Sequence, residues 1–430
     1  MTMMGLLHSV ALSTQFLLIF SSSLFTNCLT LNDSTTTHHH ECHQHESNAL
    51  LSFKQSFFIS KSASYNTFSY PKTVSWIPTT DCCSWDGIEC DELTGHVISI
   101  DLSSSQLYGS MDANSTLFSL VHLQSLDLSD NGFNHSQISA RIAILKLDFP
   151  FINRLQLKVS TLQSLIQNSR RLEQLRLNFV TISSSLPHTL TNLTSLQKLS
   201  FCRCELHGEF PIGIFSLANL TYLNFAENRN LQGTLPASIG NLTNLAHLIL
   251  EDNVFHGEIP RSLFGLENLV TLDLFSNFFE GRLALDMFLK LKMLNVLDLS
   301  FNKLSLFSQN RDVNVTILPP IQSLGLSGCN LNGEIPTWIM NLTALNSLGL
   351  SRNNLQGEIP YFFFRLENLT VLDLIHNIFE GQIELDMLSK LQKLTILSLG
   401  GGNKLYFLEG KNTSNVTIPS QIPFQKTSIH

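Results

Sequence analysis

A nine-position pattern of apolar and polar residues recurs along most of the chain. It reads Leu-x-x-Leu-x-Leu-x-x-Asn in the segments Leu245–Asn253, Leu269–Asn277, Leu294–Asn302 and Leu345–Asn353. The alternating leucines predict a short β-strand whose leucines point inward and whose intervening residues point outward. The asparagine is expected to turn the chain inward and to satisfy buried backbone groups, each of which costs about 1–3 kcal/mol when left unpaired.

The copies follow one another after roughly 24 residues, which is within the range of leucine-rich repeats. A unit of this length buries its apolar side only against its neighbours, so the units stack. Gly-Glu-Ile-Pro segments such as Gly257–Pro260 supply a tight turn and the start of the next segment. We therefore predict an α/β fold, a curved leucine-rich-repeat solenoid with a parallel sheet on its concave face. Regular units begin at Leu172, Leu196, Leu220, Leu245, Leu269, Leu294, Ile321, Leu345, Leu369 and Leu394.

The chain divides into four predicted segments. They are a signal peptide at 1–28, a cysteine-containing cap at 29–95, leucine-rich repeats at 96–422 with an irregular stretch at 134–171, and a non-repeat tail at 423–430. The signal peptide is indicated by an apolar stretch followed by small residues up to Cys28. The cap is expected to cover the apolar end of the first repeat.

A block of several repeats is duplicated, because Leu269–Glu280 matches Leu369–Glu380. The second copy loses the repeat after Ile422, and no closing cap follows. We therefore expect the last residues to be a truncation, an intron read-through or a frameshift tail.

Cysteine usage is typical of an oxidising compartment. Cys42, Cys82, Cys83 and Cys90 cluster before the repeats and allow three pairings. A bond between the adjacent Cys82 and Cys83 would be strained. We expect the bonds Cys42–Cys82 and Cys83–Cys90, and the pairing of Cys42 with Cys83 stays open.

Three further cysteines do not form a matched set. Cys204 and Cys329 stand where other repeats carry asparagine, so we expect buried free thiols there. Cys202 falls on the outward side of the strand pattern and is expected to be a free surface thiol.

Charge and motifs exclude several function classes. Charged residues make up 14% of the chain and the formal net charge is −8, which argues against a nucleic-acid binder with a basic stripe. The sequence carries no glycine-rich phosphate loop, kinase motif or Gly-x-Ser-x-Gly elbow, so we expect a non-enzymatic protein without a cofactor. The histidines around Cys42 are not expected to bind a metal. Recurrent aspartates at one strand position are interpreted as a ladder of exposed residues, and they are Asp127, Asp273, Asp298 and Asp373.

Glycosylation sequons are abundant, and several belong to the Asn-Leu-Thr phrase of the repeat. The predicted sites are Asn32, Asn114, Asn134, Asn192, Asn219, Asn241, Asn314, Asn341, Asn368, Asn412 and Asn415. Glycans there would cover the convex and lateral sides and leave the concave sheet free.

The free sheet is the candidate ligand-binding surface, because exposed aromatic and arginine side chains are typical of binding hot spots. The predicted ligand-binding residues are Arg176, Phe179, Arg203, Tyr222, His247, Glu251, Phe275, Phe301, Arg352 and His376. The hypothesis concerns the row, since any single one of them is also compatible with an ordinary solvated strand.

The cap motif Cys-Cys-x-Trp-x-Gly-x-x-Cys at Cys82–Cys90, followed by Leu-x-Gly-x-Ile-Pro repeats, resembles the plant leucine-rich-repeat receptor-like proteins. These include the tomato resistance receptors against leaf mould and Verticillium wilt. The resemblance covers residues 1–422 and implies extracellular perception of pathogen or developmental signals. It also implies a membrane span near the C-terminus and signalling through partner receptor kinases. This sequence departs from that plan, since it contains no such span, non-repeat island or closing cysteine pair.

We therefore predict an extracellular ligand-recognition module for pathogen perception and defence signalling, which enters the secretory pathway and acts outside the cell or at its surface. The expected partners are a protein or peptide ligand and, for an anchored full-length form, a receptor-like kinase co-receptor. Two alternatives stay open. One is a secreted polygalacturonase-inhibitor-like protein, whose family shares the cap and repeat type, and the other is a non-functional truncated resistance-gene product.

Overall fold

The computed structural model divides the chain into two compact units, Met1–His39 and His40–His430. The described residues all belong to the second unit, and they are 40–64, 66–109, 115–131, 155–156, 162–163, 166–167, 171–308, 318–384, 388 and 390–408. The expected signal peptide and C-terminal tail lie outside the described residues, as do the sequons at Asn32, Asn114, Asn134, Asn314, Asn412 and Asn415.

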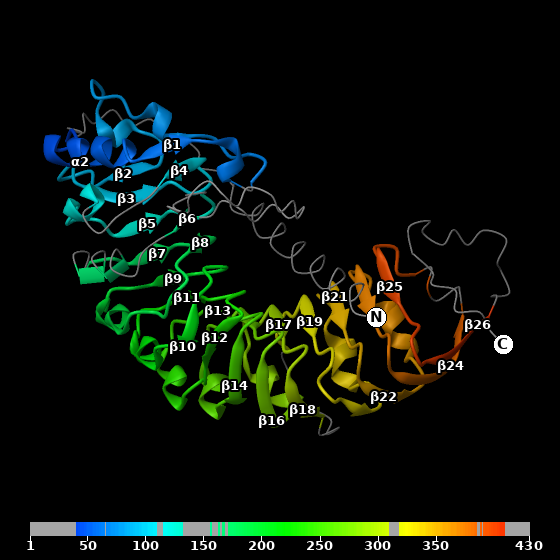
Figure 1. Cartoon of the computed structure of the whole chain (residues 1–430). Helices are drawn as coiled ribbons and strands as arrows, with labels where there is room; N and C mark the ends of the chain where they lie inside the picture. The colour runs from blue at the N-terminus through cyan, green and yellow to red at the C-terminus, as the bar shows by residue number, and fades with distance from the viewer. Residues whose placement is uncertain are drawn as a thin grey trace, which may run out of the picture. The chain divides into compact units, whose positions relative to one another are not determined.

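Short strands from successive repeats form one 13-stranded sheet, which we call the long sheet (Figure 1). Within this sheet β2 and β3 pair antiparallel, and all the following strands pair parallel. In order, its strands are β2 (Ile88–Cys90), β3 (Val97–Asp101), β5 (Ser125–Asp127), β7 (Gln174–Arg176), β9 (Lys198–Ser200), β11 (Tyr222–Asn224), β13 (His247–Ile249), β15 (Thr271–Asp273), β17 (Val296–Asp298), β19 (Ser323–Gly325), β21 (Ser347–Gly349), β23 (Val371–Asp373) and β25 (Ile396–Ser398).

Further strands follow most of the long-sheet strands and pair with one another on the other side of the repeats (Figure 1). One parallel sheet contains β10 (His207–Glu209), β12 (Asn230–Gly233), β14 (Val254–Glu258), β16 (Phe278–Ala284) and β18 (Lys303–Phe307). A second contains β20 (Asn332–Gly333), β22 (Asn354–Gly357), β24 (Ile378–Glu384) and β26 (Lys404–Leu408). Two smaller pairs are β1 (Phe57–Ile59) with β4 (Leu107–Gly109), and β6 (Leu155–Gln156) with β8 (Val180–Thr181).

Short 3₁₀ helices complete the repeats. In the regular repeats most of them begin directly after a proline, as η8 does after Pro260, which agrees with the predicted role of the Gly-Glu-Ile-Pro segment. Gly257 in that segment has φ of 78°, a conformation that glycine adopts without strain. The helices are α2 (Gln44–Lys54), η1 (Lys61–Ala63), η2 (Lys72–Ser75), η3 (Cys82–Ser84), η4 (Thr116–Ser119), η5 (His188–Asn192), η6 (Ile212–Ser216), η7 (Ala237–Asn241), η8 (Arg261–Gly265), η9 (Leu285–Lys290), η10 (Thr337–Asn341) and η11 (Tyr361–Arg365).

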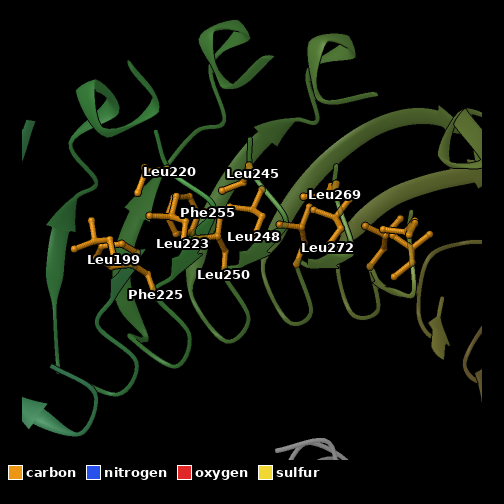
Figure 2. Close-up of a cluster of buried hydrophobic side chains, with 14 of the residues drawn as sticks. Leu199, Leu220, Leu223, Phe225, Leu245, Leu248, Leu250, Phe255, Leu269 and Leu272 are labelled. Atoms are coloured by element: carbon orange, nitrogen blue, oxygen red, sulfur yellow. The ribbon is translucent and has the colours of Figure 1, made fainter. Parts of the chain in front are cut away.

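The core consists of rows of equivalent side chains, as the repeat predicts. Figure 2 shows Leu223, Leu248 and Leu272 from successive repeats next to one another, and all three are fully buried. Phe225 and Phe255 extend the same core between the long sheet and the opposite strands. Because each repeat buries its apolar side against the next, the core grows with every unit and needs no globular centre.

The repeat asparagine joins adjacent repeats through its side chain. Asn277 donates from Nδ2 to the carbonyl oxygen of Leu250 at 2.7 Å, and its Oδ1 accepts the backbone N–H of Phe255 at 2.9 Å. Both partners belong to the preceding repeat, so the predicted role of the asparagine is confirmed. Cys204 replaces the asparagine in its own repeat, and its buried thiol donates to the carbonyl oxygen of Leu177 at 3.0 Å. Cys329 makes the equivalent bond in its repeat, at 3.2 Å.

The cap is held by two disulfide bonds, Cys42–Cys82 and Cys83–Cys90, which are the two expected from the sequence. The four sulfurs lie within 4.8 Å of one another, but each is bonded in a disulfide and so is not available as a thiolate ligand. The buried rings of Trp76 and Trp85 stack beside them, with centroids 5.5 Å apart. Gly87 has φ of 80°, and a Cβ there would lie 2.2 Å from the carbonyl oxygen of Asp101. The glycine of the cap motif therefore permits close contact between the cap and the first repeat.

The irregular stretch before Leu172 is long enough for one additional repeat but supplies no described strand to the long sheet. β5 pairs directly with β7, although about 50 residues separate them, which is twice the usual interval. β6, from within the stretch, pairs instead with β8 on the other side of the repeats. The extra residues are therefore inserted between two adjacent repeats of the long sheet.

Candidate recognition surface

The outward residues of the long-sheet strands, together with the two residues before each repeat asparagine, form a surface that we call the long-sheet face. In β13, for example, Leu248 is fully buried while His247 and Ile249 point away from the core and are half-buried. All ten predicted ligand-binding residues belong to this face. Seven are half-buried, and Phe301, Arg352 and His376 are exposed.

The position directly before the repeat asparagine has a left-handed backbone. φ is 61° at Phe179, 55° at Arg203, 57° at Phe301, 54° at Arg352 and 56° at His376. This conformation is unfavourable for a residue with a Cβ. It is supported by hydrogen bonds between repeats, such as the one from the N–H of Phe179 to Cys202 at 2.8 Å. The backbone therefore fixes the direction of the side chain at this position, whichever residue occupies it.

The arginines at the N-terminal part of the face are paired. Arg203 forms an ion pair with Glu227 and lies over the ring of Phe179, 5.5 Å from its centroid. Arg176 contacts Asp127 at 3.5 Å. These cations are therefore already balanced by carboxylates of the same face.

A polar group follows in the next repeats. The rings of Tyr222 and His247 lie 5.5 Å apart, and Nδ1 of His247 is 3.0 Å from Oγ1 of Thr271. Burial, and after it the charge of Lys198, lowers the pKa of His247. The imidazole is therefore neutral at pH 7, and it is suited to hydrogen bonding with a ligand rather than to charge pairing.

Three carboxyl groups are gathered in the middle of the face. Asp273 and Asp298 are register partners on β15 and β17, and Glu251 lies in the repeat before them. Burial, followed by Glu227 and two aspartates, raises the pKa of Glu251 to about 8. Burial and then Glu251 raise the pKa of Asp273 well above its usual range, and burial also raises the pKa of Asp298. The sequence placed these aspartates in an exposed ladder, whereas the structure holds them half-buried, because neighbouring strands pack on both sides.

An aromatic pair adjoins the carboxyl groups. The rings of Phe275 and Phe301 meet edge to face with centroids 5.5 Å apart. Arg352 lies two repeats farther on, beyond Gly328. The structure therefore brings Phe275 and Phe301 together but separates Arg352 from them by one repeat. His376 lies against Gly401, where an added Cβ would be 2.7 Å from Nδ1.

One prediction for this face is wrong. Cys202 is 8% exposed and is therefore not a surface thiol. The strand alternation ends at Ser200, and the hydrogen-bonded turns of the two adjoining repeats flank Cys202. Burial raises the pKa of this thiol well above its usual range, so it is protonated at pH 7.

The described sequons occupy two positions of the repeat. Asn192, Asn241 and Asn341 end 3₁₀ helices and are exposed. Asn219 and Asn368 instead precede a long-sheet strand, and their Nδ2 atoms donate to carbonyl oxygens of the preceding repeat, at 3.0 and 3.2 Å. None of the five lies on the long-sheet face.

Comparison with known proteins supports both the cap and the repeats. Residues 43–91 match the family model described as leucine rich repeat N-terminal domain, and residues 320–342 match the one described as Leucine Rich Repeat. Receptor-like protein 6 from Arabidopsis thaliana is 33% identical over 276 residues, which are 54% of this chain and 27% of that relative. Receptor-like protein Cf-9 from Solanum pimpinellifolium is 34% identical over 230 residues, which are 45% of this chain and 26% of that relative. The chain spans about a quarter of the length of these curated relatives.

A solved structure supports the fold. The leucine-rich-repeat ectodomain of the Arabidopsis thaliana membrane receptor kinase GASSHO1/SCHENGEN3, solved in complex with CASPARIAN STRIP INTEGRITY FACTOR 2, has 28% sequence identity and a TM-score of 0.51. The match covers 83% of this chain and 47% of that ectodomain. Within the described ranges of this chain, no helix has both the length and the apolar character needed to span a membrane.

Proposed function

We propose that this chain, a leucine-rich-repeat protein whose curated relatives are plant receptor-like proteins, binds an extracellular polypeptide ligand on its long-sheet face. The finer proposal is that it contributes to pathogen perception and signals through a partner receptor kinase. The curated relative Cf-9 and the receptor-kinase ectodomain with its bound factor support this direction by analogy.

The observation that carries the proposal is a comparison of the two copies of the duplicated block. Most inward-facing positions are identical, as in Leu272 and Leu372, or Asn277 and Asn377, and the buried replacements of Leu283 by Ile383 and of Phe288 by Leu388 keep an apolar side chain. Outward positions of the long sheet and its turns differ in all but one case, which is Asp273 and Asp373. The changed pairs are Thr271 and Val371, Phe275 and Ile375, Ser276 and His376, Val296 and Ile396, and Asp298 and Ser398. In addition, the three glycines Gly400, Gly401 and Gly402 stand in place of Ser300 and Phe301. Divergence on the face over a constant core is expected of a surface that binds different chemistry at different repeats.

A peptide library tests the proposal without knowledge of the natural ligand. The secreted full chain is immobilised and panned against phage displaying random 12-residue peptides. We expect enriched peptides to bind the wild type and to lose binding in the triple variant Phe275→Ala, Phe301→Ala and Arg352→Ala, because truncated hot-spot residues cost more than about 1 kcal/mol each.

The matched control carries Phe278→Ala, Arg282→Ala and Phe307→Ala on β16 and β18, the opposite side of the same repeats. These are again two phenylalanines and one arginine, and they include an exposed ring at Phe278. Equal loss in both triple variants, or no enrichment at all, would contradict the proposal. A polygalacturonase inhibition assay with the same proteins tests the alternative function. If the wild type inhibits the enzyme and only the long-sheet variant loses this inhibition, the inhibitor function would replace the receptor proposal.

A further inference from the structure

The carboxyl groups in the middle of the long-sheet face have no cation of their own. Glu251, Asp273 and Asp298 form no ion pair with any residue in the part of the chain that the structure describes, and the nearby Arg203 is paired with Glu227. Oδ1 of Asp273 accepts the N–H of Phe275 at 3.1 Å, so the carboxyl group is held in place by backbone. Burial and the neighbouring acidic groups disfavour the charged forms of these carboxyl groups, and a cation brought by a partner would stabilise the charged forms.

Next to these groups the face has an aromatic surface and a floor that contains three glycines. Phe301 is 41% exposed and its ring leans over Gly328, where a Cβ would meet the ring at 3.2 Å. The carboxyl group of Asp298 lies over Gly325, where a Cβ would be 2.4 Å from its oxygens. Gly349 follows at the same strand position in the next repeat. Because these strands carry no side chain of their own at this position, the surface beside the aromatic pair is formed by backbone, with the carboxyl group of Asp298 lying over Gly325.

The far side of this floor carries the opposite charge. Arg352 is exposed, and its guanidinium makes no hydrogen bond or ion pair with the residues described by the structure. From β17, which carries Asp298, to β21, which precedes Arg352, there are two strand spacings of about 4.8 Å each. An extended chain covers that distance in about three residues at ~3.3 Å per residue.

We propose that the long-sheet face between Glu251 and Arg352 binds an extended polypeptide segment that crosses the strands and carries three recognisable groups. A lysine or arginine side chain of the segment contacts Asp273 and Asp298. An apolar side chain packs on Phe275 and Phe301, and an acidic side chain about three residues from the cation pairs with Arg352. This inference rests on the proposed function and names the chemistry of the ligand.

The second copy of the duplicated block supports the assignment of this binding site to the first copy. It keeps Asp373 but has Ser398 in place of the second aspartate. It also has Ile375 in place of Phe275, and the glycines Gly401 and Gly402 in place of Phe301. The same scaffold therefore carries the complete set of groups in one copy and not in the other, and the second copy supplies substitutions that this fold already contains.

The test compares peptides selected by the wild type with those selected by four single variants. Asp298→Ser and Phe301→Gly introduce the residues of the second copy, and Phe301→Gly also suits the left-handed backbone. Gly325→Ala would push the carboxyl group of Asp298 aside, whereas Gly349→Ala meets only Oγ of Ser327 at 3.2 Å and is the matched control. Circular dichroism and urea unfolding verify that each variant is folded.

We expect wild-type selection to enrich peptides with Lys or Arg, an adjacent apolar residue, and Asp or Glu about three positions from the cation. Affinity of a selected synthetic peptide should fall at least about tenfold in Asp298→Ser, Phe301→Gly and Gly325→Ala, and less than about twofold in Gly349→Ala. Enriched peptides that lack a cation, yet lose binding in the Phe275, Phe301 and Arg352 triple variant, would overturn this inference and leave the proposed function standing. Absence of any enrichment would count against both.

Discussion

Asn277 provides the most direct test of how adjacent repeats are joined. Its side chain is 5% exposed and binds the carbonyl oxygen of Leu250 and the N–H of Phe255, both in the preceding repeat. Asn277→Ala leaves the N–H of Phe255 buried and unpaired, whereas the carbonyl oxygen of Leu250 keeps its bond from Nδ2 of Asn253 at 2.9 Å. The orphaned N–H costs about 1–3 kcal/mol and the lost bond to Leu250 about 0.5–1.5 kcal/mol, so we expect a destabilisation of about 2–4 kcal/mol in total.

Asn277→Cys is the informative comparison, because the chain itself uses cysteine at this position in two repeats. A thiol there keeps the donor for Leu250, as Cys204 does for Leu177 at 3.0 Å, but it loses the acceptor for Phe255. We therefore expect a destabilisation of about 1–3 kcal/mol, which is smaller than that of the alanine variant by the value of the bond to Leu250. Asn354→Ala, at an exposed position of β22, is the control and should change stability by less than about 0.5 kcal/mol.

Hydrogen exchange followed by mass spectrometry is the suitable assay, because a stack of repeats need not unfold in a single step. A loss of 2–4 kcal/mol raises local opening by roughly 30- to 700-fold, so amides of the repeats that contain Phe255 and Asn277 should exchange faster by that factor. Amides near the cap should not change. Wild-type protection in Asn277→Ala would refute the bridging role, and a cysteine variant as damaging as alanine would refute the thiol as a substitute donor.

Three further predictions concern the cap, the carboxyl cluster and the sequons. Gly87→Ala should destabilise the protein by several kcal/mol, since its Cβ would meet backbone of Asp101 at 2.2 Å; a wild-type urea midpoint would contradict this. The pKa of Glu251 is about 8 in the folded state against 4.5 ordinarily, so stability should fall as pH rises from about 5 to 8. Urea unfolding of Glu251→Gln should show a smaller fall, and an equal one would refute the shift. Asn241→Gln should remove one glycan, seen as a mass decrease of the secreted protein, whereas Asn244→Gln, outside any sequon, should not.

Much of the scaffold was predictable from the sequence because each of its elements repeats. The buried leucines, the bridging asparagine and its cysteine replacements follow from one period, since every repeat meets the same neighbours. The cap disulfides were predictable because few pairings of four cysteines are possible without strain. The irregular stretch was harder, because its leucine spacing resembles a repeat, although β5 pairs directly with β7 and β6 lies on the other side.

The chemistry of the face was less predictable, because it depends on which side chains meet across repeats. Simple alternation placed Cys202 outside, but the turn after the strand buries it. Asp298 looked like one member of an exposed ladder, yet its environment is set by Asp273 on one side and by the missing side chain of Gly325 on the other. Predicting such contacts requires knowledge of how three neighbouring strands are aligned, and the sequence pattern of a single repeat does not contain that information.

The left-handed residue before each asparagine explains how this fold separates stability from recognition. Its backbone is held by an N–H bond to the next repeat, whether the residue is Phe301, Gly328 or Arg352. The conformation costs about 1–2 kcal/mol for a residue with a Cβ and little for glycine. Phe301→Gly therefore relieves strain in the folded state, while the added freedom of glycine in the unfolded chain acts in the opposite direction by about 0.4–1 kcal/mol. The two effects nearly cancel, so changes at this position can alter binding strongly with little effect on stability. Changes at the neighbouring asparagine should do the reverse, because that side chain forms hydrogen bonds to the preceding repeat and is largely buried, as at Asn277 and Asn302.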